Sequence, residues 1–157
     1  MAIKTVITQY PTCFPSKVAC RDGAAHVYSL QHNDELWNGA VVAKGDYVSL
    51  DLYEAKEATT MDAKIVDVAA NSNFYVEIQK DIPATEAVLV YNVPMIEEEY
   101  NKNFQKESNY YIPAETVARA YTLREGDIIE LSKDNFTGVP AVGKTITSIT
   151  GKKWVIA

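Results

Sequence analysis

Apolar and polar residues alternate in short runs along most of this chain, and the alternation predicts β-strands. The runs are rich in Val, Ile, Thr and Tyr, and residues typical of turns (Gly, Pro, Asn and Asp) lie between them. The pattern therefore favours a mainly β fold, an antiparallel sandwich or barrel, over a parallel sheet with crossover helices. The predicted strands are Ile3–Thr8, Ala25–Leu30, Gly39–Ala43, Tyr47–Glu54, Ala63–Val68, Phe74–Gln79, Ala87–Val93, Val117–Thr122, Ile128–Leu131, Thr145–Ile149 and Lys153–Ile156.

One segment carries a helical pattern instead. Ile96, Tyr100 and Phe104 recur at every fourth position, so they share one face of a helix over Ile96–Lys106. We therefore expect one short helix and long loops beside the strands.

This helical segment divides the chain into a β-rich lobe (1–93), a helical or loop connector (94–107) and a smaller β-rich lobe (108–157), with one continuous domain as the alternative. Each lobe holds a similar phrase: Val41–Leu50 reads VVAKGDYVSL, and Leu123–Leu131 reads LREGDIIEL. Glycine adopts positive φ and aspartate bonds to nearby backbone, so we expect each Gly-Asp pair to form a tight turn before a strand. Internal duplication is one explanation for the two copies of this phrase, and chance is the alternative.

Composition narrows the class of protein. The chain has 157 residues, of which 47% are hydrophobic, and this suits one globular domain or one domain with a small appendage. Its net charge of −6 argues against nucleic acid as a partner, because proteins that grip phosphate backbones carry basic surfaces. No segment is apolar and long enough to serve as a secretory signal or to span a bilayer, so we expect no membrane partner. We expect a protein made and kept in a cytoplasm, with export by a route other than a signal peptide as the alternative.

The two cysteines give no motif. Cys13 and Cys20 are separated by six residues, a spacing that fits neither a CxxC redox pair nor a zinc-ligand pair. We expect two reduced thiols, with a disulfide between them as the alternative.

The segment Gly138–Thr145 matches the phosphate-binding pattern GxxxxGK[ST]. That chemistry needs a helix after the loop, so that the backbone N–H groups at its start face the phosphates. The residues that follow, Ile146–Gly151, are β-branched and alternate instead. We therefore interpret the match as a turn between strands, and we expect no nucleotide cofactor.

Two histidines are further candidates for chemistry. His26 lies in a predicted strand, and His32 lies in the polar segment Gln31–Glu35. A metal site formed by His32 with Asp34 or Glu35 is one hypothesis, and the polar neighbours favour a solvent-exposed loop. No GxSxG nucleophile motif is present. We therefore expect a non-catalytic protein without cofactor or metal.

Ten tyrosines indicate protein contacts, because tyrosine combines a large contact area with a polar tip. The long segments without strand periodicity, Tyr10–Gly23 and Asn92–Tyr111, are where we expect these contacts, with Asn101–Ile112 as the central part of the second. The predicted partner contacts are Tyr10, Phe14, Tyr100, Phe104, Tyr110 and Tyr111.

The phrases Asn38–Val42, Gly45–Val48, Tyr121–Asp127 and Gly151–Trp154, with the size, acidity and strand texture of the chain, resemble small β-rich head proteins of tailed bacteriophages, the capsid decoration or cement class. This resemblance implies a structural virion protein that is assembled in the host cytoplasm and binds the outer surface of a capsid. It further implies the major capsid protein as partner and a symmetric homo-oligomer. The alternative is a carbohydrate- or receptor-binding β module that stacks ligands on Trp37, Trp154 and exposed tyrosines, and an enzyme on a β scaffold is a third class.

Overall fold

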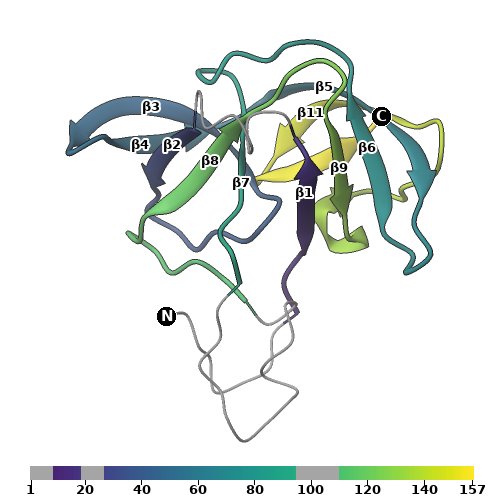
Figure 1. Ribbon diagram of the computed structural model, residues 1–157, viewed down its shortest axis with the longest axis horizontal. Coiled ribbons are helices and arrows are strands. Elements are labelled where there is room, and N and C mark those ends of the chain that lie inside the picture. Colours follow the sequence, from purple (N-terminus) through teal and green to yellow (C-terminus); the bar gives the residue numbers. More distant parts are fainter. Residues whose placement is uncertain (1–8, 19–26, 95–109) are drawn as a thin grey trace, which may run out of the picture.

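The computed structural model describes residues 9–18, 27–94 and 110–157. Within these ranges the fold is mainly β, as the alternation predicts: twelve strands and one short 3-10 turn, η2 (Lys133–Asn135), form two sheets. Figure 1 shows one sheet on the left and the other on the right.

Five strands close into a small barrel, in the order β2, β4, β3, β7 and β8. Neighbours are antiparallel except β2 and β4, which are parallel. A buried cluster that includes Leu30, Val42, Val90 and Ala118 packs among these strands. The bounds are β2 (Val27–Gln31), β3 (Val41–Ser49), β4 (Leu52–Glu57), β7 (Val88–Val90) and β8 (Ala118–Thr122).

The other seven strands form a sheet in the order β1, β9, β6, β5, β11, β12 and β10. Neighbours are antiparallel except β10 and β12. The bounds are β1 (Cys13–Lys17), β5 (Thr60–Val68), β6 (Phe74–Ile78), β9 (Ile128–Leu131), β10 (Phe136–Thr137), β11 (Thr145–Thr150) and β12 (Lys153–Ile156).

A second and larger buried cluster joins the barrel to the sheet. It contains Val41 and Leu89 from the barrel together with Ile129 and Trp154 from the sheet. The Trp154 ring is fully buried, and its Nε1 donates a 3.0 Å hydrogen bond to the Gly39 carbonyl. The two sheets therefore share one core, which anchors the barrel.

The strands on either side of the connector 94–107 pair with one another in both sheets. In the barrel, β8 lies between β2 and β7, and in the sheet β9 lies between β1 and β6. Each sheet is thus built from residues of both predicted lobes.

Most described strands lie where alternation predicts them, and β9 and β12 agree with the prediction to the residue. The predicted strand Tyr47–Glu54 is wrong, because it contains the end of β3, a two-residue turn and the start of β4. Two strands were missed. Strand β1 contains Pro15 and lies at a sheet edge, where the missing N–H of proline is tolerated, while β10 is only two residues long. The predicted strand Ile3–Thr8 and the predicted helix Ile96–Lys106 lie outside the described residues.

The prediction of a turn at Gly45–Asp46 is wrong, because both residues lie within strand β3. Between Lys44 and Tyr47, β3 has one more residue than its partner β4, which is a β-bulge. A Cβ at position 45 would collide with the Glu54 carbonyl oxygen. Glycine is therefore needed here for the close approach of two backbones rather than for a turn.

The turn expected at Gly126–Asp127 is confirmed. Gly126 has a φ of +90°, and the Asp127 Oδ2 accepts a 3.0 Å hydrogen bond from the backbone N–H of Arg124. Strand β9 follows directly. The two similar phrases thus adopt different structures, one a bulge within a strand and the other a turn before one.

Candidate functional site

Three of the predicted contact residues are brought together by the fold. The Tyr10 and Tyr111 rings stack with centroids 5.3 Å apart and an interplanar angle of 17°. The Tyr10 hydroxyl lies 3.0 Å from Glu35 Oε2 and donates to it. Tyr10 and Tyr110 are both buried, whereas Tyr111 is half-buried. These tyrosines are packed against the body of the protein.

Phe14, another predicted contact, is half-buried in β1, where it pairs with Glu130 of β9. Tyr100 and Phe104 lie outside the described residues.

Beside these tyrosines lies a pocket of about 500 Å³ that is open on one side. We call it the tyrosine pocket. It is formed by residues of β2 and β8, by the residues after β7, and by the segment that leads to β8. The lining residues are Ser29, Tyr91, Asn92, Val93, Tyr110, Tyr111, Ile112, Pro113, Thr116, Val117, Arg119 and Tyr121.

Asn92 holds the wall of this pocket in place. Its backbone N–H donates to Asn38 Oδ1 at 2.9 Å, and its carbonyl accepts from Asn38 Nδ2 at 2.8 Å. Its side-chain Oδ1 accepts from the backbone N–H of Arg119 at 2.8 Å, and its Nδ2 lies 3.4 Å from the Val117 carbonyl. Such a connected network fixes the geometry of the wall.

Tyr110 is part of the same network. Burial raises the pKa of its hydroxyl above the usual range, and a hydrogen bond with the Asn92 side chain lowers this pKa in part. The hydroxyl therefore remains neutral at physiological pH.

Arg119 is the one charged residue among those described that line the pocket. Its backbone is fixed on both sides, because its N–H donates to Asn92 and its carbonyl accepts from the N–H of Tyr91 at 2.9 Å. Its side chain is exposed, and its guanidinium has no hydrogen-bond or ion-pair partner in the part of the chain that the structure describes. Among the described residues, the pocket therefore presents one positive charge and no counter-charge.

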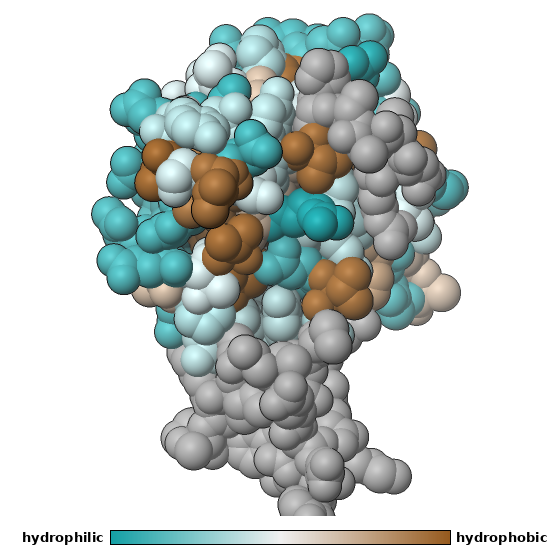
Figure 2. Space-filling model, turned by 60° about the vertical axis from the view of Figure 1, so that its left-hand side comes forward, coloured by the Kyte–Doolittle hydropathy of each residue, from teal (hydrophilic) through white to brown (hydrophobic). Residues whose placement is uncertain are grey.

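A second candidate surface is the tip of the β3–β4 hairpin, which projects from the barrel at the left of Figure 1. Leu50 is 95% exposed, Tyr47 is 58% exposed and Val48 is 53% exposed. We call these three residues the hairpin patch. Figure 2 turns this side of the molecule toward the viewer and shows apolar side chains grouped on it. Apolar groups gathered on a projecting element are typical of an interaction surface.

The tip has an unusual backbone for its sequence. Ser49 pairs with Leu52, so the loop consists of Leu50 and Asp51 alone, and both have positive φ, 50° and 60°. This is the geometry of a type I′ turn, which strongly prefers Asn-Gly because a side chain other than that of Gly or Asn is strained at positive φ. Leucine in that conformation costs about 1–2 kcal/mol.

Aromatic contacts hold the hairpin in one position. Tyr53 packs edge-on against Tyr28 and Tyr47, with centroids 5.7 and 5.4 Å apart. The Lys44 ammonium lies 4.7 Å from the centre of the Tyr28 ring and 4.5 Å from that of Tyr53. Each such contact is worth about 0.5–1.5 kcal/mol, so the patch is carried on a stiff support.

One row of paired residues connects the pocket to the hairpin patch. Arg119 of β8 pairs with Ser29 of β2, Ser29 pairs with Leu52 of β4, and Leu52 pairs with Ser49 of β3. Residues in register on neighbouring strands point to the same face of a sheet. This row ends at Ser49, beside the hairpin patch. Tyr47 of the patch pairs with Tyr53, the neighbour of Leu52, so its side chain points to the other face of the sheet.

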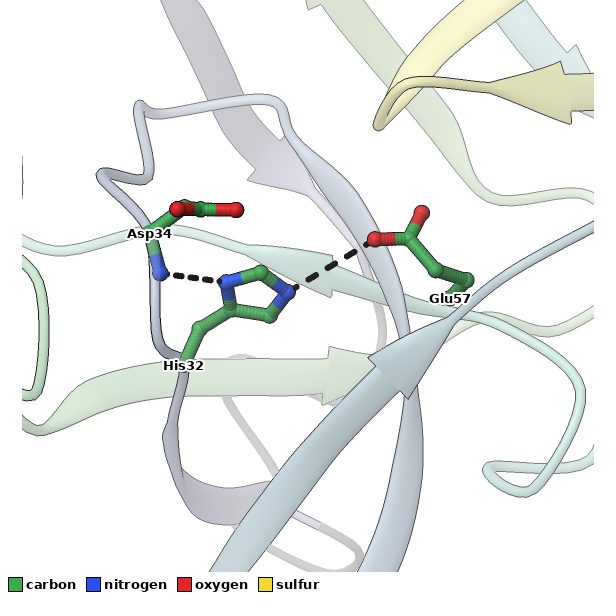
Figure 3. Close-up of polar contacts among 3 residues, drawn as sticks. All are labelled: His32, Asp34 and Glu57. Atoms are coloured by element: carbon green, nitrogen blue, oxygen red, sulfur yellow. Dashed lines mark hydrogen bonds and ion pairs between the residues drawn. The ribbon is translucent and has the colours of Figure 1, made fainter.

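His32, the candidate metal ligand, is buried rather than in a solvent-exposed loop (Figure 3). Its Nδ1 accepts a 2.9 Å hydrogen bond from the backbone N–H of Asp34, and its Nε2 lies 3.8 Å from Glu57 Oε1. The lone pair on Nδ1 is thus used to shape the loop. Among the described residues no group of three or more His, Cys, Asp and Glu side chains is placed to hold a metal ion.

The structure agrees with the interpretation of the phosphate-loop pattern. The residues after Lys144 form strand β11, so the helix that would face the phosphates is replaced by a strand.

Cys13 is a free, buried thiol, and burial, with a smaller contribution from Glu130, raises its pKa well above the usual range. The described part of the chain contains no helix long and apolar enough to cross a membrane.

The two tryptophans do not form a stacking platform together. Trp154 is fully buried in the core, so it is not available to a ligand. Trp37 is half-buried, and the ammonium groups of Lys152 and Lys153 lie 5.8 and 6.0 Å from the centre of its ring.

Comparisons with models of protein families, with curated proteins and with solved structures found no match to this chain. The hairpin patch and the tyrosine pocket are therefore the two candidate functional surfaces of the described residues.

Proposed function

We propose that this chain is a non-catalytic docking protein that binds the outer surface of a phage capsid, in the manner of a decoration, cement or head auxiliary protein. The observation that carries the proposal is Leu50, which is 95% exposed at the tip of a hairpin and has a φ of 50°. This leucine gains nothing from burial in the isolated chain and strains the turn. A contact with another protein would offset that cost.

The support beneath the tip favours the same interpretation. Binding is weakened by the entropy lost when mobile groups become ordered, so an interaction element that is held in advance binds more tightly. Tyr28, Tyr53 and Lys44 provide that support through an edge-on ring contact and cation–π contacts. Tyr47, which packs edge-on against Tyr53, adds aromatic contact area to the patch itself.

Capsid attachment requires a binding surface but no catalytic residues. A protein that bridges neighbouring shell subunits binds the assembled lattice but not the free subunits, so mass action shifts stability toward the intact shell. An interface of standard size, about 1,200–2,000 Å² in total, would suffice. The proposal includes the major capsid protein as the partner and the virion as the location. The proposal also includes a symmetric homo-oligomer, and light scattering of the purified chain measures the oligomeric state.

The direct test is mass spectrometry of particles purified by density gradient from a lysate of the source. The proposal predicts that this chain sediments with the particles in a fixed ratio to a major shell protein. Abundant chain in the soluble fraction, with none on the particles, would contradict it.

The alternative, a carbohydrate- or receptor-binding module, is favoured by one observation. The tyrosine pocket combines several tyrosine side chains with polar groups in a volume of about 500 Å³, which is in the range of small-ligand sites.

A further inference from the structure

The tyrosine pocket has a composition that selects a particular kind of ligand. Of the described residues that line it, Arg119 carries a positive charge, and no Asp or Glu is among them. The chain as a whole carries a net charge of −6. A cation in a pocket without a counter-charge favours an anionic group, and a guanidinium binds a planar carboxylate through two parallel hydrogen bonds.

The rest of the lining adds two requirements. Tyr91 and Tyr111 are half-buried and line the pocket beside the buried Tyr110, and such an aromatic wall favours a ligand with a flat or ring-shaped body. Ser29 and Thr116 supply hydroxyl groups, which favour a body with several hydroxyl groups of its own. An aromatic acid would meet the first requirement alone, and an inorganic anion would meet neither.

We propose that the tyrosine pocket binds an acidic sugar unit, a pyranose ring that bears a carboxylate. Its carboxylate lies on the Arg119 guanidinium, its ring lies against the tyrosine side chains, and its hydroxyl groups bond to Ser29 and Thr116. The site is formed in advance, since the backbone of Arg119 is fixed by Asn92 and Tyr91, and Asn92 is fixed in turn by Asn38. This inference does not rest on capsid attachment.

The test uses the purified chain without particles, so its result is independent of whether the chain docks on a capsid. Binding of glucuronate, glucose, benzoate and sulfate is measured by NMR titration at constant ionic strength. We expect glucuronate to bind with a millimolar dissociation constant and at least tenfold more tightly than glucose, with shifts at Asn92, Arg119 and their neighbours.

Two matched variants locate the charge. Arg119→Gln keeps a long polar side chain but removes the cation, and we expect it to abolish the preference for glucuronate over glucose. Arg124→Gln removes another exposed arginine, one that does not line the tyrosine pocket, and we expect glucuronate to bind as in the wild type. The Arg119 side chain is exposed, so we expect Arg119→Gln to keep the wild-type melting temperature. An unchanged melting temperature would show that a loss of binding is not caused by unfolding.

Four outcomes would overturn the proposal. Equal binding of glucose and glucuronate would remove the role of the carboxylate, and an unchanged preference in Arg119→Gln would remove the role of this arginine. Tighter binding of benzoate would indicate an aromatic acid as the ligand, while equal binding of sulfate would indicate a simple anion site.

Discussion

The β3–β4 and β11–β12 hairpins turn through the same geometry with different residues. In the second hairpin Thr150 pairs with Lys153, and the loop residues Gly151 and Lys152 have φ values of 58° and 65°. In the β3–β4 hairpin, Leu50 and Asp51 have φ values of 50° and 60°. Glycine at the first loop position avoids the steric cost of positive φ, and leucine does not.

This difference separates a turn whose residues suit its backbone from one whose residues strain it. A Cβ added to Gly151 would meet no atom within 4 Å, so space does not require glycine there and the backbone conformation alone favours it. At Leu50 the same preference is overridden by a large apolar side chain that is 95% exposed. The β3–β4 tip thus loses stability in the isolated chain, and a docking partner would account for this loss.

The largest effect is expected at the base of the β3–β4 hairpin. Gly45→Ala should lower the free energy of unfolding by about 2 kcal/mol, because the new methyl group meets the Glu54 backbone and forces the two strands apart. Denaturant titration measures this loss. An unchanged midpoint would show that the bulge can absorb a side chain.

The next test gives the β11–β12 turn a leucine like that of the other hairpin. Gly151→Leu should lower the free energy of unfolding by about 1 kcal/mol, since leucine is strained at positive φ although the site has room for it. Gly151→Asn is the matched control and should stay close to the wild type, because asparagine tolerates this conformation. If both variants unfold at the same denaturant concentration, the assumed cost of leucine is wrong.

The smallest effect is the reverse exchange at the β3–β4 tip. Leu50→Asn should raise the free energy of unfolding by about 0.5–1 kcal/mol, because the strain is relieved and almost no buried contact is lost. The thermal midpoint should rise by a few degrees. A clear fall in the midpoint would mean that Leu50 stabilises the isolated protein.

The sequence predicts the strands of this fold better than its surfaces. Strands β9 and β12 follow from simple alternation, because each has one face toward the shared core. The bulge at Gly45 could not be predicted, since the backbone that approaches it belongs to β4, nine residues further along the chain. A Gly-Asp pair alone does not distinguish a bulge from a turn.

The candidate sites depend even more on tertiary structure. The tyrosine content and the lack of strand alternation predict contacts at Tyr110 and Tyr111, but nothing in the sequence identifies Arg119 or Asn92 as their neighbours. Arg119 enters the pocket because β8 closes the barrel between β2 and β7. The polar neighbours of His32 predict exposure, so its burial does not follow from the sequence. The type I′ turn at Leu50 does not follow from it either, because the turn is defined by the pairing of Ser49 with Leu52.

We propose that Leu50 serves attachment rather than folding. This proposal is tested most directly by measuring how much purified Leu50→Asn chain binds to gradient-purified capsids from the source, beside Val139→Asn. Val139 is 80% exposed in a loop distant in sequence from the hairpin and serves as the matched control. We expect at least tenfold weaker binding for Leu50→Asn, with unchanged or higher stability, and wild-type binding for Val139→Asn. Wild-type binding of Leu50→Asn would contradict it.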